Sequence, residues 1–202
     1  PGQVFSNSAG HFNGDTFLFA SENGTIAGWR GALGTSAELL FTTPDAVYKG
    51  LAINGAKDSL FAANFHSGAI DVFNSSGLVG SFSDPTAPAG YAPFNIQNIG
   101  GTFYVTFAQQ DAAGHDDVAG VGHGFIDTFD PINHTFARLA TGSAAGGTID
   151  ALNSPWGVAL APSTFGPFGG DLLVGNFGDG VINAFDPLTG AYKGFLSGSN
   201  GD

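Results

Sequence analysis

The stretch "LLVGNFGDGVINAF" at residues 172–185 has the pattern of a β-hairpin, with an apolar run, a glycine-containing turn and a second, alternating run. A near copy, "LFAANFHSGAIDVF", stands at residues 60–73. A shorter version, "LFASENGTIAGW", stands at 18–29, and a version with a much longer turn occupies 103–129. Four copies of one hairpin in one chain indicate a repeat architecture.

Each hairpin is flanked by two more short apolar segments that read as strands. The upstream segments are "GQVFS" from Gly2, "YKGLAI" from Tyr48, "APFNIQNI" from Ala92 and "SPWGVALA" from Ser154. The downstream segments are "ELLFTT" at 38–43, "LVGSFS" at 78–83, "TFARLA" at 135–140 and "YKGFLS" at 192–197. The repeating unit therefore has four strands.

The spacing of the units predicts the fold. Equivalent positions fall at Gly2, Gly50, Asn95 and Gly157, at intervals of 48, 45 and 62 residues, which is typical of four-stranded propeller blades with loops of unequal length. We predict one all-β domain over 1–202, a β-propeller of four-stranded antiparallel blades; the alternative is a β-sandwich. The predicted blades are approximately 1–44, 45–87, 88–147 and 148–202.

Composition and charge exclude several classes of partner. The formal net charge is −12 with only five Lys and Arg residues, too few for the basic surface that nucleic acid or an anionic membrane needs. Cations are the more natural ligands of such a chain. The sequence has no cysteine, which excludes disulfides and thiolate metal sites, and it has no apolar run long enough to span a membrane.

Longer stretches carry a resemblance to a known family. "VYKGLAI", "GYAPFNIQNIGGTFYVTFAQQDA", "HDDVAG" and "NSPWGVALAPSTFGPFGGDLLVGNFGDGVINAFDPLTG" closely resemble uncharacterised, secreted bacterial proteins, some of which end in a PEP-CTERM sorting tail. The resemblance implies an extracellular bacterial protein related to the NHL and SMP-30-like propellers. It also implies a six-bladed ring of which these four blades are a part. Four blades could instead close as a small propeller, and both possibilities stay open.

The loops that enter the innermost strands and join the second and third strands of a propeller emerge on one face, around the channel. Ligands of propellers commonly bind there, so we expect an unknown small molecule, polymer or protein to bind on this face. The polar and aromatic candidates for binding are Lys49, Asn64, His66, Trp156 and Asn176.

These candidates also have structural explanations. Lys49 and Trp156 occupy the same step of their inner strands, with Phe94 between them in the third copy, which suits a sugar or an aromatic ligand, or simple packing of the channel. Asn64 and Asn176 both stand just before their turns, where an asparagine caps its own turn more often than it binds a ligand.

The insertion "AQQDAAGHDDVAGVGHG" at 108–124 replaces a short turn with a long loop. Its oxygen and imidazole groups, Asp111, His115, Asp116 and Asp117, are candidate ligands of a divalent cation, and the carboxylates favour calcium. No established metal-binding spacing is present, so the alternative is a solvated acidic loop that closes over a neighbouring blade.

Three hypotheses of function follow. The first is a secreted binding or scaffold module that uses loops on the channel face, and the second is a metal-dependent SMP-30-like hydrolase or lactonase with a cation among Glu22, Asn64, Asn176 and the 111–117 loop. The third is a structural protein that self-associates through open blade edges. No nucleophile motif occurs, and no catalytic residue is assigned.

Overall fold

The computed structural model describes residues 2–197, which form sixteen strands in four antiparallel sheets of four. The first two sheets are blade 1, with β1 (Gln3–Phe5), β2 (Phe17–Ala20), β3 (Thr25–Trp29) and β4 (Glu38–Thr42), and blade 2, with β5 (Tyr48–Ile53), β6 (Leu60–Asn64), β7 (Ala69–Asn74) and β8 (Gly77–Phe82). Blade 3 has β9 (Tyr91–Ile99), β10 (Thr102–Gln109), β11 (Phe125–Asp130) and β12 (Thr135–Thr141), and blade 4 has β13 (Pro155–Leu160), β14 (Leu172–Asn176), β15 (Ile182–Phe185) and β16 (Tyr192–Phe195).

The four-stranded units predicted from the sequence are confirmed, and so is the all-β propeller class. Short 3-10 helices, η1 (Phe12–Gly14), η2 (Gly31–Leu33), η3 (Ser143–Ala145) and η4 (Gly166–Phe168), stand in the connections. The predicted last blade extends to residue 202, of which 198–202 lie outside the described residues. Within residues 2–197 no helix has the length and apolar character needed to cross a membrane.

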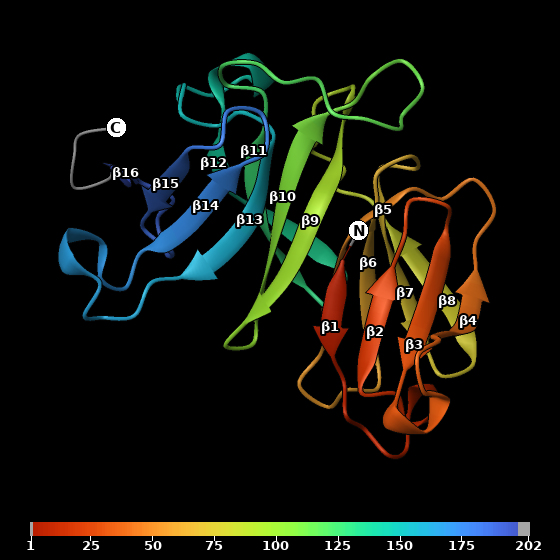
Figure 1. The fold of residues 1–202 in the computed structure, drawn as a ribbon. Coiled ribbons are helices and arrows are strands. Elements are labelled where there is room, and N and C mark those ends of the chain that lie inside the picture. The colour runs from red at the N-terminus through yellow and green to blue at the C-terminus, as the bar shows by residue number, and fades with distance from the viewer. Residues whose placement is uncertain (1, 198–202) are drawn as a thin grey trace.

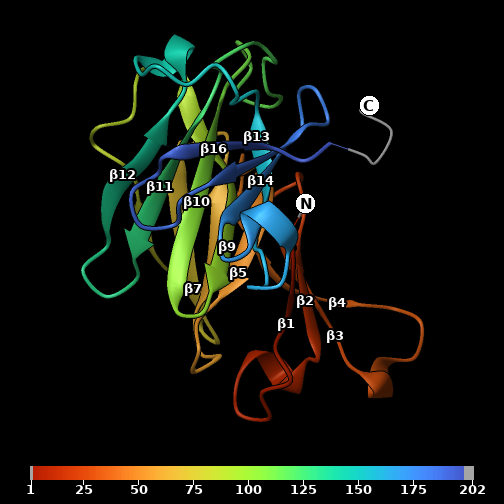
Figure 2. The ribbon, with the colours of Figure 1, turned by 90° about the vertical axis from the view of Figure 1, so that its left-hand side faces the viewer.

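The blades follow one another in chain order, from red blade 1 to blue blade 4 in Figure 1. The innermost strands β1, β5, β9 and β13 contact one another in that order, so they line the axis of the propeller. Figure 2 shows the same arrangement from the side, with the sheets turned relative to one another. Strand order within each blade is simply sequential, as expected when each strand is joined to the next by a hairpin.

Burial explains why the strands of the middle blades are continuously apolar. All five residues of β6 are buried, because Leu60 and Ala62 pack against blade 1 while Phe61 and Ala63 pack against blade 3. In blade 1 only alternate residues of β2 are buried, since only one face of that sheet is covered by another blade. The continuous apolar pattern therefore marks a sheet packed on both faces.

The register of the first repeat differs from the alignment that the sequence indicates. Ile26 pairs with Ala20 and Ile70 pairs with Ala63, which makes Leu18 the equivalent of Phe61. The sequence alignment instead makes Leu18 equivalent to Leu60, the residue just before Phe61. Between these pairs the turn of blade 1 is one residue shorter, and a shift of one residue changes which face of the sheet a side chain occupies.

Glycine allows the inner strands to approach one another at the axis. A Cβ added at Gly2 would overlap the backbone of Leu51, and one added at Gly50 would lie 2.7 Å from Cα of Asn95. Asn95 in turn donates a hydrogen bond from Nδ2 to the backbone oxygen of Trp156, at 2.7 Å, which links blade 3 to blade 4. The equivalent positions predicted from the sequence thus form a chain of contacts around the axis.

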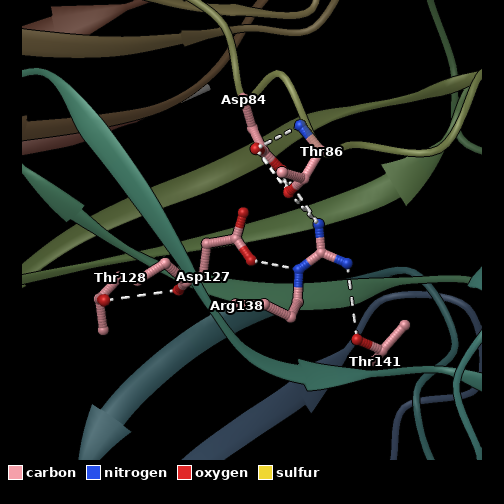
Figure 3. A network of polar contacts seen from close by, with 7 residues as sticks. Asp84, Thr86, Asp127, Thr128, Arg138 and Thr141 are labelled. Carbon is pink, nitrogen blue, oxygen red and sulfur yellow. Dashed lines mark hydrogen bonds and ion pairs between the residues drawn. The ribbon is translucent and has the colours of Figure 1, made fainter.

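A buried ion network joins blades 2 and 3 (Figure 3). Arg138 on β12 donates from Nε to Asp127 at 2.5 Å and from Nη2 to Asp84 at 3.0 Å. Burial raises the pKa of Asp127 to about 7, although Arg138 opposes the rise. Burial also acts against the charged form of Asp84, but hydrogen bonds from Thr86, with further help from Arg138, outweigh it and lower the pKa of that carboxyl.

Gly50→Ala is expected to destabilise the protein by about 2–3 kcal/mol, because the added methyl group must push β5 away from β9. Gly157→Ala is the matched control, since the nearest atom to its added Cβ lies at 3.9 Å, an ordinary contact distance. Urea unfolding followed by tryptophan fluorescence measures both. Equal stabilities for the two variants would contradict the close approach.

Asp127→Asn is expected to gain stability relative to the parent protein as the pH rises. Because the pKa of Asp127 is raised from 3.8 to about 7, its contribution is fully present below pH 3.8 and is lost between there and pH 7, by up to about 4 kcal/mol. The asparagine does not titrate and leaves Asp84 to pair with Arg138. Unfolding free energies of both proteins at pH 4.5, 6 and 8 test this, and parallel curves would refute it.

Candidate functional site

The inner strands and the loops at one end of the blades enclose a pocket of about 350 Å³. Its lining residues are Glu22, Lys49, Phe94, Asp116, Asp117, Trp156 and Phe177. Glu22 comes from the β2–β3 turn of blade 1 and Lys49 from blade 2, and the others come from blades 3 and 4. Every blade contributes at least one side chain, so only the assembled propeller creates the pocket.

Equivalent β-bulges aim three of these side chains into the pocket. The pairing of β5 with β6 shifts between Tyr48 and Gly50, so that Lys49 has no partner in the ladder. The pairing of β13 with β14 shifts in the same way around Trp156, and that of β9 with β10 shifts around Phe94. A bulge re-aims the side chain of its extra residue, which explains why these three residues share one site.

Lys49 is the charged centre of the pocket. Its side chain is only 8% exposed, and Nζ lies 2.8 Å from Oε1 of Glu22 and 3.3 Å from Oδ1 of Asp116. The ring of Phe65 lies beneath it, 5.9 Å from Nζ to the ring centroid. Hydrogen bonds from His115 and then from Lys49 hold the pKa of Asp116 below its usual value.

Aromatic rings form the opposite wall. Trp156 donates from Nε1 to the backbone oxygen of Lys49 at 3.0 Å, which fixes the indole across the top of β5. Phe94 is buried against Phe65, with ring centroids 5.2 Å apart, and meets Phe177 edge to face at 6.0 Å. Phe177 itself is 70% exposed, so a large apolar ring stands at the rim of the pocket.

The long loop of blade 3 rises above the upper ends of the strands in Figure 1, and only part of it reaches the pocket. Asp111 accepts hydrogen bonds from the backbone N–H groups of His115, at 2.8 Å, and Asp116, so its carboxylate holds the loop itself together. His115 contacts Asp116 through Nδ1 at 3.0 Å. Asp116 and Asp117 alone of the four predicted metal ligands line the pocket.

These four residues do not form a ready cation site. No set of three or more His, Asp or Glu side chains within residues 2–197 is placed to hold one metal ion. The point on which Glu22 and Asp116 converge is occupied by the ammonium group of Lys49. Calcium binding by this loop stays a prediction, and it would require Lys49 to move.

The predicted binding residues fall into two groups. Lys49 and Trp156 lie together in the pocket, whereas Asn64, His66 and Asn176 do not line it. Asn64 is buried in blade 2, where Nδ2 donates to Asp71 and Oδ1 accepts from the turn residue Ser67.

Asn176 has a similar place in blade 4, where its amide donates to the backbone oxygen of Ala151. His66 is exposed, and its backbone oxygen accepts a hydrogen bond from Nε2 of Gln110 in the long loop.

Two aromatic pocket residues were not among the predicted binding residues. The repeat alignment places Phe94 between Lys49 and Trp156 but does not mark it as a binding residue. Phe177 follows Asn176 as Phe65 follows Asn64, so the repeated "NF" dipeptide was a usable signal. It was ambiguous, because Phe65 is buried in the channel while Phe177 stands at the rim.

No family model matches the chain. Two uncharacterised proteins of Acanthamoeba polyphaga mimivirus are each 35% identical to it, one over 199 residues covering 92% of this chain and 47% of the relative, the other over 208 residues covering 96% and 53%. The chain therefore spans about half the length of these relatives.

Solved structures share the fold at low sequence identity. A protein assigned to the gluconolactonases matches with a TM-score of 0.68 and 15% identity over 96% of this chain and 62% of its own. A gluconolactonase of Xanthomonas campestris matches with a TM-score of 0.61 and 18% identity, over 89% and 56% of the two chains. A chain of the nidogen–laminin complex matches with a TM-score of 0.59 and 16% identity, over 91% and 61%. The chain therefore shares the propeller fold of these proteins.

Proposed function

We propose that this chain is a binding module that takes a small molecule, or the end group of a polymer, in the pocket at the channel mouth. The observation that carries the proposal is the origin of the pocket: all four blades supply side chains to one cavity of about 350 Å³. A cavity of this size that combines aromatic walls with a few convergent charges is typical of small-molecule sites. The ion pairs that the buried Lys49 side chain makes with Glu22 and Asp116 link three blades around it.

The rim of the pocket supports the same function. Phe177 leaves most of its ring in water, which forgoes the burial that a phenylalanine ordinarily contributes to folding. A ligand that covers Phe177 and Trp156 would recover part of that free energy. The nidogen–laminin match supplies a parallel at the level of fold only, since it comes from a complex between proteins.

We also propose that the chain acts outside the cell. This proposal rests on the resemblance to secreted bacterial proteins, including those with a PEP-CTERM tail. Self-association through unpaired outer strands is a further proposal, because each blade ends in a strand with one free edge among the described residues.

A screen of sugars, lactones, amines and aromatic acids by saturation-transfer NMR is expected to find ligands whose binding needs Trp156. Trp156→Ala is expected to weaken such ligands at least about tenfold, because the indole forms a wall of the pocket. Trp29→Ala is the control, since Trp29 is the other tryptophan of the chain and does not line the pocket. Ligands whose affinity falls in Trp29→Ala but not in Trp156→Ala would place the binding site outside this pocket.

A metal-dependent lactonase is the second candidate. The gluconolactonase folds and the convergence of Glu22 and Asp116 on one point favour it. Against it, the described residues do not fit a preformed cation site, because the ammonium group of Lys49 already stands between both carboxylates. Calcium-dependent hydrolysis of glucono-δ-lactone that EDTA stops, and that Asp116→Asn reduces, would support this candidate. Metal-free protein by elemental analysis, together with no hydrolysis in added calcium, would remove it.

A further inference from the structure

The charges of the pocket do not balance. Glu22, Asp116 and Asp117 contribute three carboxylates, and Lys49 contributes one ammonium group. Among the salt bridges of residues 2–197, Glu22 and Asp116 both pair with Lys49, while Asp117 pairs with no basic side chain. The pocket therefore carries an excess of negative charge, in a chain whose formal net charge is −12. An anionic ligand would be repelled both by the carboxylates of the pocket and by the net charge of the whole chain.

The surroundings of Lys49 show how this pocket accommodates a cation. The Lys49 side chain is 8% exposed, so most of the hydration of its ammonium group has been replaced by protein. The replacement consists of two carboxylate oxygens, at 2.8 and 3.3 Å, and the face of Phe65. A buried ammonium group needs this combination of hydrogen-bonded carboxylate and aromatic ring.

The open part of the pocket repeats that combination without a cation. Asp117 lines the same pocket as the rings of Phe94, Trp156 and Phe177. Aromatic faces attract ammonium groups through their negative quadrupoles, most strongly for tryptophan. The pocket lining thus combines a carboxylate that has no basic partner with aromatic rings, the two kinds of group that attract a positive charge.

We propose that the pocket takes an organic cation, an ammonium group carried on an apolar body. This inference rests on the proposed function and names the ligand class of that same site. A neutral sugar would use the rings but would gain nothing from the excess negative charge. A bare divalent cation would gain from the carboxylates but would have no use for three aromatic walls.

Choline and its uncharged isostere 3,3-dimethylbutan-1-ol provide the direct test, because they have the same shape and differ in charge. The readout is the fluorescence of Trp156 in a Trp29→Phe background, where it is the remaining tryptophan, with saturation-transfer NMR on the parent protein as a second measurement. We expect choline to bind at least about tenfold more tightly than the alcohol, and to weaken as sodium chloride is added, because screening acts on the charge alone.

Two outcomes would overturn the ligand class. If the alcohol binds as tightly as choline, the pocket binds ligands but does not select a cation, and the proposed function survives without this inference. If choline and the amines of the screen do not bind while its sugars, lactones or aromatic acids bind in a Trp156-dependent manner, the same conclusion holds. If no compound of the screen binds, the proposed function fails with it.

Asp117→Asn locates the cation within the pocket. We expect it to weaken choline about five- to tenfold and to leave the affinity for the alcohol unchanged, since the variant removes one charge and keeps the shape. Asp171→Asn is the matched control, because it removes the same charge at a distance from the pocket. Asp171 precedes strand β14, whereas the pocket residue Phe177 follows the opposite end of that strand. If both variants weaken choline binding equally, the effect comes from the net charge of the protein, and the placing of the ammonium group at Asp117 is overturned.

Discussion

The close approach of the inner strands around the axis is the constraint on which the rest of the structure depends. Gly2 and Gly50 have no side chain because the backbone of the next blade occupies that space, and Asn95 continues the series with a hydrogen bond to the main chain of Trp156. Blades that meet so closely at the axis must diverge outward. In blade 2 the outer strand β8 is consequently more exposed than the inner strand β5 and the middle strand β6.

The pocket is a product of the same geometry. Just above the close contacts, a bulge in each of three inner strands turns one residue out of the ladder and toward the axis. The three bulge residues are a lysine, a phenylalanine and a tryptophan. One repeated backbone feature thus brings three chemically different side chains to one pocket. Repetition of backbone with variation of side chain is how a repeat fold builds a specific site from similar units.

Two of the ion-pair networks, those of Arg138 and Lys49, differ in kind. Arg138 lies between two blades with both of its carboxylate partners, Asp84 and Asp127, and has no route to a ligand. Lys49 is equally well paired, but its partners stand at the edge of a cavity that includes another carboxylate and open aromatic surface. The Arg138 network joins two blades. The Lys49 network leaves excess carboxylate charge at the edge of a cavity that a ligand can enter.

The sequence by itself determined the all-β class, the four-stranded unit and its four copies, because hairpin pattern and turn chemistry are local properties. It also identified Lys49 and Trp156 as partners, since equivalent positions in repeats face the same axis. Only the tertiary structure decided that Asp116 pairs with Lys49, that Asn64 and Asn176 are buried inside their blades, and that Phe177 is exposed where its counterpart Phe65 is buried. Those outcomes depend on how a long loop and neighbouring sheets meet in space, and no spacing along the chain encodes that meeting.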